Sequence, residues 1–166
     1  KNNKKTLENR ERGRWKGKTD WYMYGYPKNL TKFDQSKLLV QILANRSTFS
    51  IDRDNNYYFV GGGNAGAYGI SLPKNSEISL EFLCAILNSS LTHWLVKKRS
   101  SPFQHGFCSF AKRFIEDLPV VSSKSNQTLI KKIEKKVRNL SKTITEDSDA
   151  EIDSMISKIY GLSENE

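Results

Sequence analysis

LEFLCAILNSSLTHWLVKKRS, residues 80–100, predicts a helix that packs against the core of the domain. Apolar residues recur in it at steps of three and four, the spacing of one helix face. Ser79 is suited to cap its start, and Asn88-Ser89-Ser90 marks a kink or a break into two helices. The residues of this stripe are Leu80, Leu83, Leu87, Leu91 and Trp94.

Three segments before this helix favour β structure. KLLVQILA (37–44) is a short apolar run, typical of a buried strand or a brief helix. TFSIDRDNNYYFV (48–60) has two β-prone runs around a polar turn, so we expect a hairpin. GGGNAGAYGISL (61–72) begins as a glycine loop or bulge and ends as an alternating strand. Its glycines do not match a phosphate-binding motif.

After the helix, FIEDLPV (114–120) predicts a closing strand or turn. Leucine, isoleucine and valine then repeat nearly as a heptad over residues 129–144, which suits a helix that packs on another helix or domain. Ser148 and Glu151 have capping-box spacing for a last helix. We therefore expect an α+β fold, with a sheet built from 37–72 and 110–120 and the helix over 126–144 outside the core of that sheet.

The chain is expected to comprise a basic arm or linker over 1–20, a main domain over 21–121 and a helical extension over 122–166. Trp21, Tyr22, Tyr24 and Tyr26 nearly alternate, as one face of a strand would. Trp21 and Trp94 are expected in the core. Because the first residue is Lys1 rather than Met, we expect a fragment of a longer protein.

Charge indicates the kind of partner. The chain of 166 residues carries a net charge of +9, which favours a polyanion, either nucleic acid or an anionic membrane. Residues 1–32 hold ten Lys and Arg against three acids, a net charge of +7. Residues 97–113 hold five more basic residues and no acid. A hydrophobic content of 37% argues against disorder, and no apolar run approaches the roughly 18 residues of a membrane span.

Catalytic signatures are missing from the sequence. It has no serine–histidine–aspartate order, no HExxH and no CxxC, and the two histidines, His93 and His105, stand alone. Cys84 and Cys108 are the only cysteines, and Cys84 belongs to the apolar helix, so we expect a buried thiol and a reducing, cytoplasmic setting. No motif binds S-adenosylmethionine or holds a flipped adenine. We expect the chain itself to be non-catalytic and to hold no cofactor or metal.

Four stretches together resemble the TaqI-like C-terminal specificity (target recognition) domain of adenine-N6 DNA methyltransferases and fused type II restriction-modification enzymes. More distantly, the pattern is similar to the target recognition domains of type I specificity subunits. The likeness lies in the order and spacing of the stretches, and the ending at 152–166 also resembles the tail of such proteins. The stretches are WYMYGYPKNL (21–30), KLLVQILANRSTFSIDRDNNYYFVGG (37–62), LEFLCAILNSSLTHWLVKKRS (80–100) and FQHGFCSFAKRFIEDLPV (103–120).

The resemblance implies a curved, mixed sheet with a few helices and a helical extension that docks on a parent methyltransferase. It also implies double-stranded DNA as partner, with S-adenosylmethionine bound by the parent and no membrane. The domain would then read a DNA site through the major groove. The implied DNA-binding residues are Lys97, Lys98, Arg99, Gln104, His105, Lys112 and Arg113, with Tyr26, Lys28 and Asn29 as second candidates.

Three other functions are compatible with the sequence. A non-specific or RNA-binding module would use the same basic residues and would expose aromatic rings for stacking on single strands, whereas the aromatic residues here mostly fit core stripes. A protein-interaction domain would use the helix at 126–144. A nuclease would need acidic residues in an arrangement that the sequence does not reveal.

Overall fold

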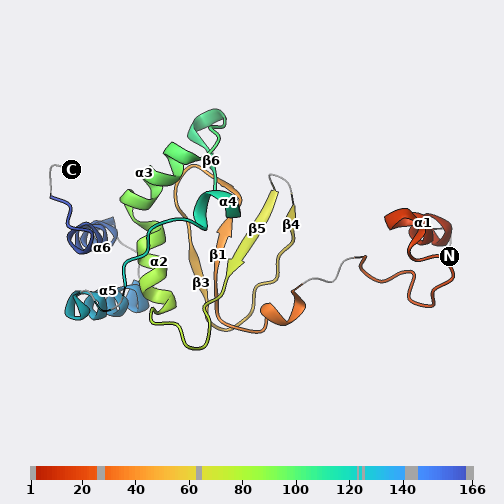
Figure 1. Cartoon of the computed structure of the whole chain (residues 1–166), viewed down its shortest axis with the longest axis horizontal. Coiled ribbons are helices and arrows are strands. Elements are labelled where there is room, and N and C mark those ends of the chain that lie inside the picture. Colours follow the sequence, from red (N-terminus) through yellow and green to blue (C-terminus); the bar gives the residue numbers. More distant parts are fainter. Residues whose placement is uncertain are drawn as a thin grey trace. The chain divides into compact units, whose positions relative to one another are not determined.

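The computed structural model (Figure 1) describes residues 3–25, 29–62, 65–122, 124, 126–140 and 146–163. The chain divides into two units, Lys1–Lys32 and Phe33–Glu166. The sheet, the central helices and the C-terminal helices all belong to the second unit. The α+β class expected from the sequence is confirmed.

The first unit contains helix α1 (Lys4–Gly13) and the short 3₁₀ helix η1 (Leu30–Lys32). α1 lies in the stretch expected to be a linking arm, and its last residues depart from helical geometry from Arg10 onward. The strand-like alternation that starts at Trp21 was misleading, because the described residues 21–25 form turns and bends. The Arg10 guanidinium accounts for this, since it donates hydrogen bonds to the backbone carbonyls of Trp21 and Met23, which a sheet partner would otherwise use.

The second unit holds a four-stranded antiparallel sheet in the order β3-β1-β5-β4. A separate two-stranded sheet pairs β2 with β6, and it is antiparallel as well. A mixed sheet was expected, but every strand pair among the described residues is antiparallel, as suits strands without long crossover connections. The strands are β1 (Lys37–Gln41), β2 (Leu43–Ala44), β3 (Ser50–Asp52), β4 (Gly61–Gly62), β5 (Ala65–Ile70) and β6 (Cys108–Ser109).

The expected hairpin over residues 48–60 is wrong, because β3 pairs with β1. Asp52 explains the difference: its carboxylate accepts hydrogen bonds from the backbone amides of Asn56 and Tyr57, each at 3.1 Å. These bonds turn the chain away from β3 before it could fold back on it. The sequence contains typical turn residues at this point, but it does not show which strand pairs with which.

Of the closing strand or turn expected over 114–120, the strand is absent from the described structure, whereas residues 116–117 do form a turn. The strand of this region is β6, and it is followed by the short helix α4 (Lys112–Ile115). Phe110 still donates its amide to the carbonyl of Ile42 at 2.7 Å, and the Ser109 hydroxyl accepts the amide of Ala111 at 3.2 Å. The chain therefore leaves the small sheet at Phe110 and turns into a helix.

The predicted helix at 80–100 is two helices, α2 (Leu80–Asn88) and α3 (Ser90–Arg99), which confirms the break that was one of the two alternatives expected at residues 88–90. Ser89 has an extended backbone between them, and its hydroxyl accepts the amide of Thr92 at 3.2 Å, so a new helix begins here. The break changes which face is buried. Trp94 is 56% exposed instead of lying in the core, while Trp21 of the first unit is half-buried.

Two further helices, α5 (Gln127–Leu140) and α6 (Glu146–Ile159), cover α2 on the side away from the sheet (Figure 1). Phe82 and Ile86 of α2 pack with them in a cluster that contains no strand residue. Leu83 and Leu87 of α2 pack with the sheet strands in a second cluster. The expectation that the helix over 126–144 lies outside the core of the sheet is therefore confirmed for its described part, 126–140. α6 begins two residues before the predicted cap at Ser148.

Candidate nucleic-acid interface

The last turn of α3 presents three cations to solvent. Lys97, Lys98 and Arg99 are all exposed, because the buried side of this helix is formed by Thr92 and Val96. The helix dipole favours cations at a helix C-terminus. It therefore offsets part of the repulsion between these three charges in the folded state. The Arg99 guanidinium donates a hydrogen bond of 3.3 Å to the backbone carbonyl of Asp117. Lys98 lies with its ammonium 5.8 Å from the centre of the exposed Trp94 ring.

A tight hairpin follows directly. At its base, the amide of Ser109 donates to the buried hydroxyl of Ser100 at 2.6 Å. Near its tip, the amide of Phe107 donates to the carbonyl of Gln104 at 3.3 Å. His105 and Gly106 both have positive φ, 58° and 76°, which is the pattern of a type I′ hairpin turn. Gln104 and His105 are therefore exposed side chains at the end of a well-braced loop.

Helix α4 adds Lys112 and Arg113, both exposed. The Lys112 ammonium forms an ion pair of 3.2 Å with Glu116, one helical turn later. The Arg113 guanidinium lies 4.7 Å from the centre of the Phe114 ring. The sequence showed no acid between residues 97 and 113, but it did not reveal that α4 would bring Glu116 back to Lys112. Both side chains of this pair are exposed, so the pair is weak.

The structure brings most of the expected site residues together. α3 contacts both β6 and α4, and the bond from Arg99 to Asp117 ties the end of α3 to the turn that follows α4. We call this set the basic surface; it comprises Lys97, Lys98, Arg99, Gln104, His105, Lys112 and Arg113. Tyr26 and Lys28 lie outside the described residues. Asn29 belongs to the first unit, where it is exposed with a φ of 58°.

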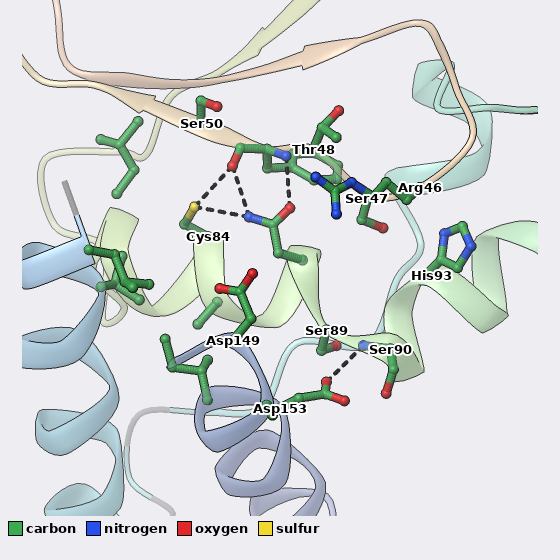
Figure 2. A pocket seen from close by; sticks show the side chains of 18 of the residues that line it. Arg46, Ser47, Thr48, Ser50, Cys84, Ser89, Ser90, His93, Asp149 and Asp153 are labelled. Atoms are coloured by element: carbon green, nitrogen blue, oxygen red, sulfur yellow. Dashed lines mark hydrogen bonds between the residues drawn. The ribbon is translucent and has the colours of Figure 1, made fainter. Parts of the chain in front are cut away.

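A pocket of about 700 Å³ lies at the other end of α3. In Figure 2, side chains from α2, α3, α6 and the segment before β3 converge on it. The carboxamide of Asn88 both accepts from the amide and donates to the carbonyl of Phe49, each at 2.8 Å. Asp153 of α6 accepts the first amide of α3, that of Ser90, at 2.8 Å (Figure 2). These bonds fix where α3 begins, and hence where its cationic end points.

Two titratable groups of the pocket have shifted pKa values. Burial raises the pKa of the Cys84 thiol to about 11, so the thiol is protonated at neutral pH. Burial, and then the charge of Lys97, lower the pKa of His93, so its imidazole is neutral. Within the described ranges, no three His, Cys, Asp or Glu side chains gather as a metal site would require. No helix among the residues that the structure describes is long and apolar enough to cross a membrane.

Comparisons with known proteins point to one family. A family model described as the TaqI-like C-terminal specificity domain matches residues 2–120, a range that includes the whole basic surface and stops before α5. The chain is also similar to the type II restriction enzyme and methyltransferase RM.Eco57I of Escherichia coli, with 33% identity over 106 residues. The aligned stretch covers 63% of this chain and 10% of that relative, so the chain spans about a tenth of the relative's length.

Proposed function

Because the chain belongs to the TaqI-like C-terminal specificity domain family, we propose that it recognises a specific sequence in double-stranded DNA. In this proposal it is the specificity domain of a bacterial adenine-N6 DNA methyltransferase or restriction-modification enzyme in the cytoplasm. The remainder of that enzyme binds S-adenosylmethionine and carries out the chemistry. The described residues of this chain hold DNA in place and contribute no reacting group.

The observation that carries the proposal is the basic surface on a rigid support. Its cations stand at the end of a helix whose start is held by Ser89 and Asp153, beside a hairpin closed by Ser100. Phosphates of the DNA backbone attract such cations without regard to sequence, and this attraction supplies much of the affinity. A hairpin that projects from a fixed base is suited to enter a major groove about 12 Å wide.

Side chains of the surface differ in what they can recognise. Lys97 and Lys98 are flexible point charges, which suits contacts to phosphate. Arg99 and Arg113 have planar guanidinium groups that match the two acceptors of a guanine edge. Gln104, at the hairpin tip, has the donor and acceptor that pair with the edge of adenine. We therefore assign the lysines to affinity and the three other residues to base discrimination.

A salt titration tests the assignment of the lysines. With about five phosphates neutralised, the affinity for a duplex should fall roughly 500-fold between 50 and 200 mM salt. Lys97→Ala and Lys98→Ala should each weaken all duplexes alike and reduce the salt slope by about one unit. Lys112→Ala should have a somewhat smaller effect, since the ammonium must leave its ion pair with Glu116 to contact a phosphate. Lys131→Ala, an exposed lysine on α5, is the matched control and should leave the slope unchanged.

The choice of DNA site by the parent enzyme tests the three residues assigned to base discrimination. Its target is found by sequencing the methylated positions, and variants are then assayed on that target and on single-base changes of it. Arg99→Ala, Gln104→Ala and Arg113→Ala should each cost about 1–3 kcal/mol on the target and relax discrimination at one base pair. If alanine at all of these positions and at the three lysines leaves affinity and discrimination intact, the basic surface does not bind DNA.

A further inference from the structure

Three consecutive apolar side chains face solvent in the Lys1–Lys32 unit. Tyr22 is 65% exposed, Met23 52% and Tyr24 65%. Single exposed apolar residues are ordinary, but a contiguous group of large ones usually marks a binding surface. The sequence pattern had suggested that most aromatic residues lie in the core. Among the described residues 3–25 and 29–32 of this unit, the buried aromatic residue is instead Trp15, which the pattern did not single out.

The exposed group stands on a braced turn. Arg10 packs its guanidinium 5.2 Å from the centre of the Trp15 ring, and it donates to the carbonyl of Trp21 at 3.0 Å and to that of Met23. The amide of Met23 donates to the carbonyl of Asp20 at 2.9 Å, which closes the turn. We call residues 20–24 the aromatic turn. Because its backbone is pinned on both sides, a partner need not spend binding energy on ordering it.

The surroundings of the aromatic turn are strongly cationic. Residues 1–32 carry a net charge of +7, and several of these cations are exposed in the described part of the unit. The ammonium of Lys4 lies 5.7 Å from the centre of the Trp21 ring, next to Tyr22. The exposed cations include Lys4, Lys5, Arg12, Lys16 and Lys18. This charge favours a polyanionic partner over a neutral or basic one.

Rings and cations together fit one chemical class best, the unpaired nucleotide. Proteins that hold single strands combine a positive groove for the phosphates with aromatic side chains on which bases stack. A closed duplex hides the faces of its bases, so it offers the phosphates but nothing for Tyr22 and Tyr24 to stack on. We propose that the aromatic turn is a second DNA contact, which binds unpaired nucleotides by stacking Tyr22 and Tyr24 on their bases.

This inference rests on the proposed function only in taking DNA as the nucleic acid. An enzyme that modifies a base must take that base out of the stack, which leaves an orphaned partner and weakened neighbours in the duplex. Nucleotides of this kind arise beside the site that the basic surface is proposed to read. The aromatic turn would then bind the opened DNA, while the basic surface binds the paired DNA.

The test uses the full chain and three fluorescent probes of one sequence: a closed duplex, the same duplex with four central mismatches, and the single strand. Anisotropy titrations compare the native chain with Tyr22→Ala, Tyr24→Ala and both together. Each substitution should weaken binding of the mismatched and single-stranded probes about 5- to 150-fold, the range for one base stacked on an aromatic ring. Binding of the closed duplex should change less than twofold.

Two kinds of control separate stacking from other causes. Tyr22→Phe and Tyr24→Phe keep the ring and should retain nearly the full affinity. Tyr57→Ala removes a tyrosine of the other unit that is 63% exposed, and it should leave the preference for unpaired probes unchanged. Tryptophan fluorescence of Trp15 and circular dichroism check that each variant is folded.

The inference is overturned if the alanine variants lose affinity equally for all three probes, or if they lose none. Equal loss would mean a contact to duplex DNA, and no loss would mean that the turn does not contact nucleic acid. The same measurements distinguish failure of this inference from failure of the proposed function. If Lys97→Ala and Lys98→Ala weaken duplex binding while the tyrosine variants have no effect, only the inference fails. The reverse result would remove the duplex-reading role and leave the aromatic turn as the nucleic-acid contact.

Discussion

At the scale of single residues, the least expected feature is the buried ion pair of Lys37 and Asp52. The ammonium lies 2.5 Å from the carboxylate, and the two side chains are 3% and 2% exposed. Lys37 also donates to the carbonyl of Phe33 at 2.9 Å, and Asp52 accepts two backbone amides at the start of the next loop. Burial alone would raise the pKa of Asp52, but the hydrogen bonds from Lys37 and from these amides outweigh it and lower the pKa.

Breaking this pair should be costly. Lys37→Met leaves a buried carboxylate without its cation, and we expect a loss of about 3–5 kcal/mol in the free energy of unfolding. The same measurement by urea titration on Lys124→Ala, whose pair with Glu77 is exposed, should show a loss below about 1 kcal/mol. A Lys37→Met variant as stable as the native chain would mean that the pair does not hold the β3 end in place.

The lowered pKa of Asp52 also sets a pH dependence. Since the folded pKa lies below the unfolded one of about 3.9, the unfolded chain takes up the proton first as the pH falls. The stability that Asp52 contributes is therefore complete above about pH 5 and is lost as the pH falls through the folded pKa. Urea titrations from pH 6 to pH 2.5 give the free energy of unfolding at each pH. In Asp52→Asn this free energy should fall less steeply with acid than in the native chain. An unchanged dependence in that variant would contradict the assignment.

At the scale of elements, sequence patterns worked where one period continues and failed where it is interrupted. The stripe from Leu80 to Leu87 lies in the core as predicted, and KLLVQ (37–41) is a strand. The break at residues 88–90 was one of the expected alternatives, but the prediction of a buried Trp94 was wrong, because the extended Ser89 restarts the helix in a new phase and turns Trp94 outward. The partners of β3 and the course of the chain after Phe110 depend on contacts far apart in sequence, and no local pattern encodes them.

The candidate site was also predictable only in part. Its cations were visible in the sequence because charge is a property of each residue, and exposure at a helix end follows from amphipathicity. The bracing of the hairpin was not visible, since it depends on the bond between Ser100 and Ser109. The aromatic turn was missed for a related reason: alternation of Trp21, Tyr22 and Tyr24 is equally compatible with a strand and with a turn pinned by a distant arginine.

The hairpin of the basic surface offers a prediction for one element. Ser100→Ala leaves the buried amide of Ser109 without an acceptor, which should cost about 1–3 kcal/mol of stability. It should also reduce discrimination between the target and single-base changes more than it reduces overall duplex affinity, because the tip of the hairpin is no longer held in one position. The exposed neighbour Ser101→Ala is the control and should resemble the native chain. Equal behaviour of the two variants would show that the base of the hairpin is unimportant.

At the scale of the whole molecule, the division into two units has an observable consequence in unfolding. Ile133 of α5 is fully buried against α2, so Ile133→Ala should cost the second unit about 2–5 kcal/mol. In a chain labelled with 5-fluorotryptophan, Trp94 reports on that unit and Trp15 on the first. Fluorine NMR in urea should show an earlier transition for Trp94 only. A common shift of both signals would mean that the chain unfolds as one cooperative body.

The bond pair between Asn88 and Phe49 has a further consequence, which concerns how copies of the chain meet in solution. β3 is an edge strand, and an open edge is a template on which another chain can add a strand and begin to aggregate. The carboxamide of Asn88 occupies the amide and the carbonyl of Phe49, just as a neighbouring strand would. Asn88→Leu keeps the size of the side chain but frees that peptide group. Light scattering of concentrated samples should therefore show the variant forming aggregates that the native chain avoids.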